Sequence, residues 1–290
     1  MKFKPAYIEA TTLDDAWYQL LYNIDTFGRK YKIDAGSYAG DSRLEFDSVS
    51  GFIHKAHERP LSPKVPEGSG LPVPTDDASI EQYFANYLMD PNLEPHEEYR
   101  YATWINGQML PYPQYCRFCK CSEFKEIDEK HRFVYHSERK KWEEHFVCQG
   151  QHILEMKNCP MNKPNTQLDW CIRHFKEKGY GNNHCHILIG DRHSSLAYEK
   201  PYTNEMERGT SPCLRGIDLK IKDGQLVMGI TFRSWDLYSG FPENMGGFIL
   251  LNEFIAAQLD NVEPGPLAFH SHGLHCYGFQ LDVLKARLGK

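Results

Sequence analysis

The sequence predicts an α+β fold, because strand patterns and helix patterns occupy separate stretches of the chain. Residues 217–221 and 226–232 alternate apolar with polar side chains, which is the period of a β-strand. Residues 12–27 and the stretch that begins at Asn244 carry apolar side chains three or four positions apart, which is the period of a helix. Paired strands and amphipathic helices in one chain indicate an α+β domain.

The two alternating runs predict an antiparallel hairpin. Between them lies Asp223-Gly224, a dipeptide that tolerates the positive φ angles of a two-residue type I′ turn. If Lys222 and Gln225 flank this turn, apolar residues face apolar residues along the whole pair. The expected partners are Ile217 with Ile230, Leu219 with Met228, and Ile221 with Leu226.

The open end of this hairpin contains a candidate nucleophile. The same register sets Cys213 opposite Ser234 and Leu214 opposite Arg233, to within the one residue that a bulge would add. A guanidinium beside a thiol favours the thiolate, which is the reactive form of cysteine. The alternative is that Cys213 is a small buried hydrophobe at a strand end.

Five further segments complete the predicted secondary structure. The proline-rich segment 59–75 is expected to be a surface loop, and a helix is expected from Asp76-Asp77 to Leu88. A helix over 168–179 precedes a short buried strand over 186–190. The last predicted helix starts at Asn244, and Gly246-Gly247 indicate that another element approaches it closely.

Composition restricts the class of protein. At 290 residues, with 41% hydrophobic and 25% charged residues, the chain is long enough for one principal globular domain. A net charge of −6 and a pI near 6.2 argue against a nucleic-acid partner. Apolar runs are too short for a membrane helix, and the N-terminal residues lack the apolar core of a secretory signal, so we expect a cytoplasmic protein.

A cluster of cysteines indicates an insertion over residues 110–164. Nine cysteines without an export signal indicate reduced thiols. Within the segment, Cys-x-x-Cys spacing suits tetrahedral zinc ligation. The predicted ligands are Cys116, Cys119, Cys148 and Cys159. The alternative is a set of reduced thiols that bind no metal.

The segment from Phe232 to Asn244 resembles the substrate-binding segment of the thymidylate synthases and pyrimidine nucleotide hydroxymethylases. Pro212-Cys213 resembles the nucleophile motif of that family, with Arg233 following Cys213 by 20 residues and Asn244 following it by 31. His275-Cys276-Tyr277 resembles the later His-x-Tyr motif. The resemblance is best over residues 209–285 and is closest to the shorter, archaeal-like branch of the family.

This resemblance implies a fold and an organisation for the whole chain. The fold would be thymidylate synthase-like, a large mixed or antiparallel sheet flanked by helices, interrupted by the Cys-rich insertion. Residues 1–290 would form a single domain, of which 209–290 is the catalytic core segment. The resemblance also implies a homodimer.

The implied reaction is folate-dependent transfer of a one-carbon unit to C5 of a pyrimidine nucleotide, with dUMP as the expected substrate. The cofactor would be 5,10-methylenetetrahydrofolate or a related pterin. Cys213 would add to C6 of the base and so activate C5. Asn244 would read the pyrimidine edge, although an asparagine at the start of a helix can also be a simple cap.

The resemblance also implies roles for the remaining site residues, either in binding the phosphate, the sugar or the folate or in transferring protons. Arg43 in Gly40-Asp41-Ser42-Arg43 would contact the phosphate. So would Arg233 and Ser234, and a guanidinium suits a phosphate because it donates two hydrogen bonds. His275 and Tyr277 would contact the sugar hydroxyl. Catalytic Asp236, with Gly240, would contact the folate, and Glu81 in Ile80-Glu81-Gln82-Tyr83 would move protons.

One departure from the family pattern leaves alternatives open. Asn182-Asn183-His184 stand where the family has an arginine pair that completes the phosphate site, and Arg192, His184 or His186 could compensate. The alternatives are a CMP or dCMP 5-hydroxymethylase of a modified-nucleotide pathway and a non-catalytic nucleotide-binding homologue. The product could carry a methyl or a hydroxymethyl group.

Overall fold

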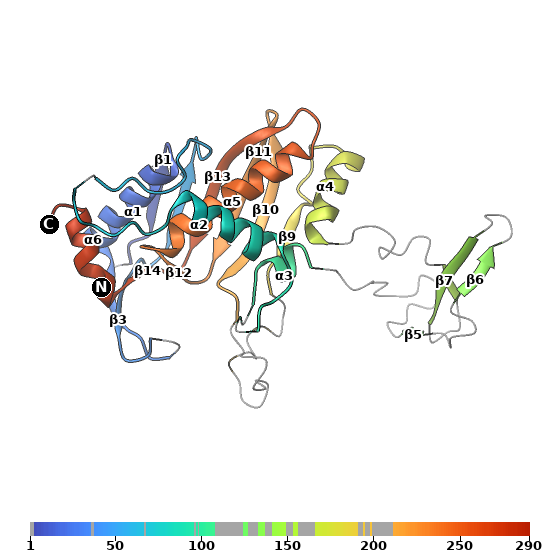
Figure 1. Ribbon diagram of the computed structural model, residues 1–290, viewed down its shortest axis with the longest axis horizontal. Coiled ribbons are helices and arrows are strands. Elements are labelled where there is room, and N and C mark those ends of the chain that lie inside the picture. Colours follow the sequence, from blue (N-terminus) through green and yellow to red (C-terminus); the bar gives the residue numbers. More distant parts are fainter. Residues whose placement is uncertain are drawn as a thin grey trace. The chain divides into compact units, whose positions relative to one another are not determined.

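A computed structural model describes most of the chain and divides it into two compact units (Figure 1). The described residues are 3–35, 38–66, 68–95, 97, 99–107, 166–190, 194, 198 and 211–290, together with the backbone of four strands between 124 and 155. One unit comprises Met1–Gly107 with Cys171–Lys290, and the other comprises Gln108–Trp170. The insertion expected over 110–164 stays a prediction about domain organisation.

The second unit contains a small antiparallel sheet. Its central strand β7 pairs with β5, β6 and β8. The bounds are Phe124–Glu126 for β5, Phe133–His136 for β6, Lys141–Cys148 for β7 and Ile153–Glu155 for β8.

The first unit is built on a mixed six-stranded sheet with the order β1-β4-β13-β11-β10-β9. The strands are parallel between β1 and β4 and between β11 and β13, and antiparallel at the other three junctions. The bounds are Ala6–Ala10, Val49–Ile53, Glu263–Ser271, Gln225–Phe232, Leu214–Lys222 and His186–Leu188, in that order. The predicted α+β class with a large mixed sheet is confirmed.

The two faces of this sheet differ as the sequence alternation requires. A row of mutually paired positions across all six strands is buried, and it consists of Ile8, Gly51, Phe269, Ile230, Ile217 and Ile187. The neighbouring row lies on the opposite face, and its end residues Tyr7 and Leu188 are 65% and 52% exposed. Because side chains alternate along a strand, a one-residue register slip would exchange the two rows.

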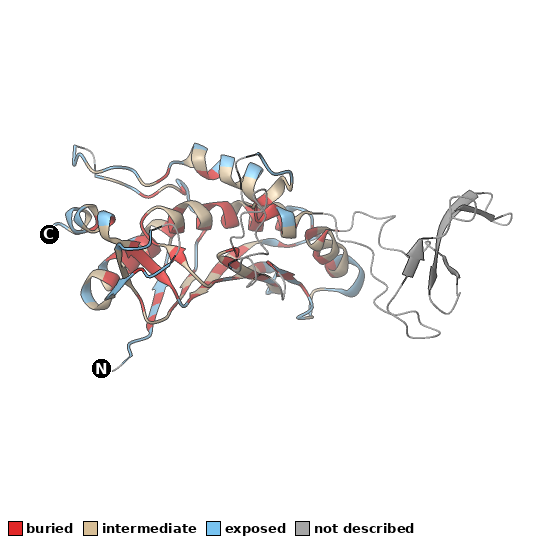
Figure 2. Ribbon diagram, turned by 90° about the horizontal axis from the view of Figure 1, so that it is seen from below, coloured by how far each residue is buried: buried red, intermediate tan, exposed pale blue. Residues whose placement is uncertain are grey.

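Two long helices cover the buried face. Helix α1 (Leu13–Phe27) contacts β1 and β4, and helix α5 (Gly240–Ala257) contacts β11 and β13. Figure 2 shows the buried residues between helices and sheet. The indole of Trp17 on α1 is fully buried and donates from Nε1 to the carbonyl of Leu237 at 3.1 Å, which ties α1 to the segment before α5.

The β10–β11 hairpin has the predicted turn and, over most of its length, the predicted register. Asp223 and Gly224 have φ angles of 50° and 75°, as a type I′ turn requires. Pairing runs as expected from Lys222–Gln225 to Ile217–Ile230. A bulge then shifts the open end by one residue, so that Leu214 faces Phe232 rather than Arg233. A bulge places two residues of one strand opposite one of its partner.

A second, four-stranded sheet has the order β12-β14-β3-β2. Its bounds are Trp235–Asp236, Leu274–Tyr277, Ser42–Glu45 and Arg29–Lys32. Strand β12 follows directly after β11, and β14 follows directly after β13. The small sheet therefore begins at the end of strands β11 and β13 that also carries Cys213, the residue just before β10.

The helices that cover the sheet lie where the sequence predicted them, but one continues as a π-helix and another begins earlier than expected. Helix α4 (Gln167–Lys178) matches the expected segment, and the helix expected from Asp76 is α2 (Asp77–Gln82) continued by a π-helix, η1 (Tyr83–Met89). Helix α5 begins at Gly240, four residues before the expected start, because the first turn of a helix tolerates Pro242. Asn244 therefore lies in the second turn and does not cap the helix.

Three short elements complete the first unit: α3 (Ala102–Ile105), a 3₁₀-helix η5 (Gly278–Gln280) and α6 (Leu281–Arg287). Among the described residues, none of the helices is both long and apolar enough to cross a membrane.

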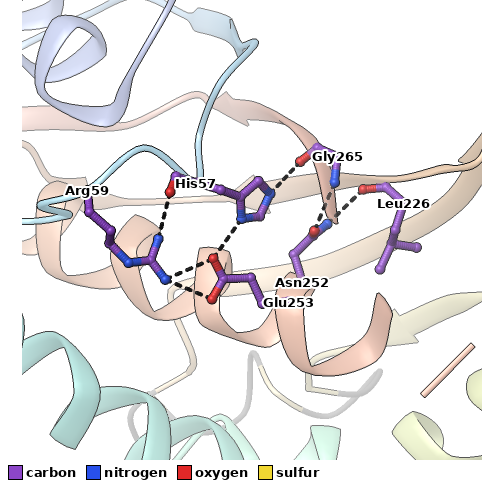
Figure 3. A network of polar contacts seen from close by, with 6 residues as sticks. All are labelled: His57, Arg59, Leu226, Asn252, Glu253 and Gly265. Carbon is purple, nitrogen blue, oxygen red and sulfur yellow. Dashed lines mark hydrogen bonds and ion pairs between the residues drawn. The ribbon is translucent and has the colours of Figure 1, made fainter. Parts of the chain in front are cut away.

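A polar network fixes α5 to the strands and to the loop that follows β4 (Figure 3). The fully buried Asn252 donates to the carbonyl of Leu226 at 2.8 Å and accepts from the amide of Gly265 at 3.2 Å. The neighbouring Glu253 accepts from both His57 and Arg59. The side chain of Asn252 thus satisfies two backbone groups where the β11–β13 register is interrupted.

Candidate active site

The half-buried Cys213 lies immediately before β10, and Arg233 holds the segment around it. The Arg233 guanidinium donates to the carbonyls of Ser211 and Pro212 at 2.6 and 3.1 Å, and its backbone amide donates to the carbonyl of Cys213 at 2.9 Å. The same guanidinium donates to the hydroxyl of Tyr198 at 2.6 Å. A fixed cation therefore borders the thiol, as the hairpin register predicted to within one residue.

Four tyrosines form a cluster that borders Cys213 through Tyr87, Tyr99 and Tyr101, and the site interpretation of the sequence did not include them. Tyr83 and Tyr87 come from η1, and their rings stack at 5.3 Å. Tyr99 and Tyr101 follow, with ring centroids 5.6 Å apart. The Tyr99 hydroxyl lies beside the thiol and the backbone of Cys213, and the Tyr101 hydroxyl accepts from the amide of Leu214 at 3.3 Å.

These phenols are neutral at physiological pH. Burial raises the pKa of Tyr99 to about 12, and it also raises the pKa of Tyr83, Tyr87 and Tyr101. Their hydroxyl groups therefore remain donors as well as acceptors beside the thiol.

The π-helix η1 carries Tyr83 and Tyr87. A π-helix is typical of functional sites, because it changes the direction of the side chains that it carries.

The carboxamide of Asn244 has a defined orientation. Its Oδ1 accepts from the indole Nε1 of Trp235 at 2.9 Å. An indole N–H is only a donor, so it selects the oxygen of Asn244 and leaves Nδ2 directed elsewhere. Tyr83 lies beside this group. Asn244 can therefore offer both a donor and the second lone pair of Oδ1 to a ligand.

Two glycines of α5 let Tyr83 approach Asn244. A Cβ on Gly247 would lie 2.4 Å from Cδ1 of the Tyr83 ring, and one on Gly246 would lie 2.8 Å from the Ile80 side chain. Both separations are too short for any larger residue. The close approach predicted from Gly246-Gly247 is thus present, and the approaching elements are α2 and η1.

Asp236 lies on β12 and accepts three hydrogen bonds. The donors are the amides of Tyr238 and Gly240 at 3.1 and 3.3 Å and the Gln280 carboxamide at 3.2 Å. Burial raises the pKa of Asp236. A Cβ on Gly240 would lie 3.3 Å from Cβ of Asp236 and 3.7 Å from Oδ1 of Asn244, so Gly240 lies between these two residues.

His275 presents an unpaired acceptor. Its Nδ1 lies 2.8 Å from the carbonyl of Gly273, so Nδ1 carries the proton and donates. The ring is 2% exposed, and Nε2 has no hydrogen-bond partner among the residues that the structure describes. Burial lowers the pKa of His275 to about 4, helped by the charge of Arg43. The neutral ring therefore keeps a buried acceptor at Nε2 that no described residue satisfies.

Tyr277 and Arg43 border His275. Rings of His275 and Tyr277 lie 4.6 Å apart on β14, and Tyr277 faces Arg43 on β3. Arg43 pairs with Glu45, with 2.6 Å between Nε and Oε2. The structure thus brings Arg43 to the two predicted sugar contacts. No hydrogen bond or ion pair joins Arg43 to the described residues of the Arg233 cluster.

Two carboxylates differ in their surroundings. Glu81 is exposed on α2, and none of the described residues forms a hydrogen bond or ion pair with it. Glu243 precedes Asn244 and is half-buried, and burial, with a smaller effect of Asp76, raises its pKa. Ser234 follows Arg233, and its hydroxyl makes no hydrogen bond to the described part of the chain.

The residues considered for phosphate compensation have other partners or lie outside the description. His184 contacts His174 at 3.0 Å, and His186 contacts Asp218 at 3.0 Å. Arg192 lies outside the described residues, as do the side chains of the four predicted zinc ligands. Among the described residues, no group of three or more His, Cys, Asp or Glu suits a metal.

The sequence contained partial signals for the residues that were missed. The predicted helix that included Tyr83 did not reveal which way its ring points. The segment Tyr99-Arg100-Tyr101 resembles a tyrosine segment of the family, but this resemblance assigned it no role in the site. Trp235 and Gln280 orient Asn244 and Asp236, and no motif marked either of them for that role.

Comparisons with known proteins place these features in context. None of the family models searched matches the chain. A protein of Methanosarcina acetivorans named "Putative thymidylate synthase" is 34% identical over 74 residues, which is 26% of this chain and 34% of that protein. A protein of the same name from Methanocaldococcus jannaschii is 37% identical over 71 residues, 24% and 32% of the two chains. The matches span about a third of these curated relatives.

A solved structure shares the fold. The thermostable thymidylate synthase A of Bacillus subtilis superposes with a TM-score of 0.54 over 97% of this chain and 85% of its own, at 15% sequence identity. The predicted thymidylate synthase-like fold is therefore confirmed. The chain is therefore similar in sequence to archaeal proteins named as putative thymidylate synthases and shares its fold with a thymidylate synthase.

Proposed function

We propose that this chain transfers a one-carbon unit from a reduced folate to C5 of a pyrimidine nucleotide, with dUMP as substrate and Cys213 as covalent nucleophile. The observation that carries the proposal is that three unlike groups are held in defined environments, the first of them beside the Cys213 thiol. These are the cation Arg233, the oriented carboxamide of Asn244 and the unpaired Nε2 of His275. Each suits a different part of one nucleotide.

The chemistry requires a nucleophile such as Cys213. C5 of uracil is a poor nucleophile until a thiolate adds to C6, which moves an electron pair to C5 and O4. C5 would then attack the one-carbon electrophile and lose its proton to a base, and cleavage of the bond to the folate nitrogen would leave an exocyclic methylene. Hydride or hydroxide would add to this methylene, and the S–C6 bond would then break to release the thiolate. Adjacent phenols, above all that of Tyr99, would donate hydrogen bonds to the sulfur or to ordered water.

Asn244 supplies the recognition of uracil. Its Nδ2 would donate to O4, where negative charge develops after thiolate addition, and Oδ1 would accept from N3–H while keeping the contact to Trp235. Cytosine presents the opposite pattern at these two positions. The fixed orientation of the carboxamide therefore favours dUMP over the alternative CMP and dCMP substrates.

Contacts to the sugar and the phosphate would fix the position of the nucleotide relative to Cys213. The His275 Nε2 acceptor suits the hydrogen of a sugar hydroxyl, with Tyr277 beside it. Arg233 and Ser234 would contact the phosphate from the strand end that borders the thiol. Arg43, which lies next to Tyr277, would reach the phosphate only after leaving Glu45.

The folate-binding residues fit a pterin. Asp236 accepts three hydrogen bonds, so its carboxylate retains acceptor capacity for the N–H donors of a pterin ring. Gly240 leaves space between Asp236 and Asn244. The folate supplies the one-carbon unit. Asp236 would orient it against the base, and the choice between a methyl and a hydroxymethyl product depends on whether hydride or water completes the reaction.

A carboxylate would organise water near the base. Glu81 was predicted for this role, and Glu243 is a second candidate because it adjoins Asn244 and has a raised pKa. Comparing Glu81→Gln with Glu243→Gln decides between them. The residue that acts shows a loss of C5 proton release with an unchanged affinity for dUMP.

The decisive experiment measures release of tritium from C5 of dUMP in the presence of methylenetetrahydrofolate. We expect release by the unchanged protein, none by Cys213→Ala and a residual rate with Cys213→Ser. Undiminished release by Cys213→Ala would exclude the covalent mechanism. Product mass separates methyl from hydroxymethyl, and parallel assays with UMP, dCMP and CMP identify the substrate. Nucleotide binding without proton release would indicate a non-catalytic homologue.

The assembly is a further proposal that follows from the family resemblance. The outer face of the six-stranded sheet carries Tyr7 and Leu188 in exposed positions, so it offers apolar surface to a second copy. Light scattering at known concentration would report a mass near twice 33.7 kDa for a homodimer.

A further inference from the structure

Two guanidinium groups meet at Ser211, two residues before the candidate nucleophile. Arg215 donates from Nη2 to the Ser211 hydroxyl at 2.7 Å, and Arg233 donates from Nη2 to the Ser211 carbonyl at 2.6 Å. Ser211 itself is 1% exposed, and both arginines are half-buried. Within the described part of the chain, neither arginine forms an ion pair with a carboxylate.

The bulge in β10 explains why Arg215 is available. Ile217 and Leu219 point into the core, so an uninterrupted strand would also direct Arg215 there. The register shift between Leu214 and Gly216 makes Arg215 the additional residue. Leu214 then takes the core position, with no exposure, and the Arg215 guanidinium turns to Ser211. Bulges commonly redirect a side chain next to an active site.

Gly190 provides space for this guanidinium. Its φ angle is 82°, and a Cβ at this position would lie 3.2 Å from Nη1 of Arg215 and 2.7 Å from the hydroxyl oxygen of Ser194. Arg215 therefore packs against bare backbone just after β9. Because the oxygens of Ser211 carry no net charge, the two positive charges remain uncompensated by the contacts that hold them.

We infer that Arg215 determines specificity for the phosphate monoester, by binding the phosphate of the substrate together with Arg233. The inference rests on the proposed function and adds to it a residue that no motif indicated. A dianion balances two cations, and the fork of a guanidinium matches two phosphate oxygens. Both cations come from one chain, so they compensate for the arginine pair that Asn182-Asn183-His184 replace.

The test compares a substrate with and without phosphate. Arg215→Gln should lower kcat/KM for C5 proton release from dUMP about 10- to 100-fold, the usual effect of losing one charged hydrogen bond. With deoxyuridine, which has no phosphate, the same variant should change kcat/KM by less than about threefold. A merely structural role would affect both substrates equally.

Matched variants complete the experiment. Lys220→Gln removes the same charge from the same strand away from Ser211 and should leave the dUMP to deoxyuridine ratio unchanged. Arg215→Met keeps an unbranched side chain in place of the aliphatic part of arginine, and it replaces Arg215→Gln if that variant does not fold. An unchanged ratio in whichever variant folds overturns the role of Arg215. Calorimetric dUMP binding that weakens in the variant, in a protein that releases no C5 proton, supports the phosphate site and rejects the proposed reaction.

Discussion

Replacing Asn244 by aspartate is the sharpest test of base recognition, because it changes one atom of the proposed hydrogen-bond pattern. Oδ1 accepts from Nε1 of Trp235 at 2.9 Å, and a carboxylate oxygen can accept the same bond. Nδ2 becomes an acceptor, which would face O4 of uracil, also an acceptor. The 4-amino group of cytosine could instead donate to it.

The expected magnitude follows from this exchange. Losing one hydrogen bond and leaving an acceptor unpaired costs about 2–4 kcal/mol. That corresponds to a loss of about 30- to 700-fold in kcat/KM for dUMP. The activity with dCMP should rise relative to dUMP by at least the same factor, because the new acceptor gains a donor.

The assay is C5 proton release from dUMP and dCMP, measured for both substrates at the same pH. Trp235→Phe is the matched variant. It retains an aromatic ring against Phe232, now stacked at 4.0 Å, but removes the donor that orients the carboxamide. It should lower the preference for dUMP by a smaller factor, because the carboxamide of Asn244 can then rotate and exchange the positions of Oδ1 and Nδ2. A dUMP to dCMP ratio that Asn244→Asp leaves unchanged within threefold would refute the assigned role.

Three further predictions concern stability and packing. Asn252→Leu removes partners from two buried backbone groups and should lower the free energy of unfolding by about 2–5 kcal/mol in urea titration; the exposed Asn86→Leu is its control, and an equal effect of both would contradict the reasoning. His275 has a folded pKa of about 4 against 6.5 when unfolded, so its stabilisation is complete above pH 6.5 and is lost as the pH falls towards 4. Between pH 7 and pH 5 this amounts to about 2 kcal/mol, which should disappear in His275→Gln; a pH dependence that persists in the variant would assign it to other groups. Gly247→Ala places a methyl 2.4 Å from the Tyr83 ring and should destabilise by about 1–3 kcal/mol and reduce C5 proton release, whereas Gly229→Ala, with no neighbour closer than 3.6 Å, should do neither.

Local sequence was sufficient for the hairpin that carries Cys213. Asp223-Gly224 determines the turn, and period-two alternation determines which residues face the core, since both effects act between near neighbours. Helix α1 and the α2–η1 helix were predictable for the same reason. The start of α5 was wrong by four residues, because a proline in the first turn is compatible with a helix.

The bulge at Arg215 could not be predicted from the alternation. Leu214 and Ile217 both point into the core, although they are three positions apart and strict alternation would direct them to opposite faces. Packing of the whole sheet decides where the alternation of inward and outward side chains shifts by one residue. The register of the open hairpin end therefore differed by one residue from the expected one.

The sequence by itself determined the strand and helix periods, the β10–β11 register and the spacing that relates Cys213 to Arg233 and Asn244. Only the tertiary structure decided which groups surround the thiol. Tyr99 and Cys213 are more than a hundred residues apart, and no local rule connects them. The orientation of Asn244 depends on Trp235, and the unpaired nitrogen of His275 depends on the carbonyl of Gly273. Such contacts arise from packing between distant elements, whose geometry periodicity does not encode.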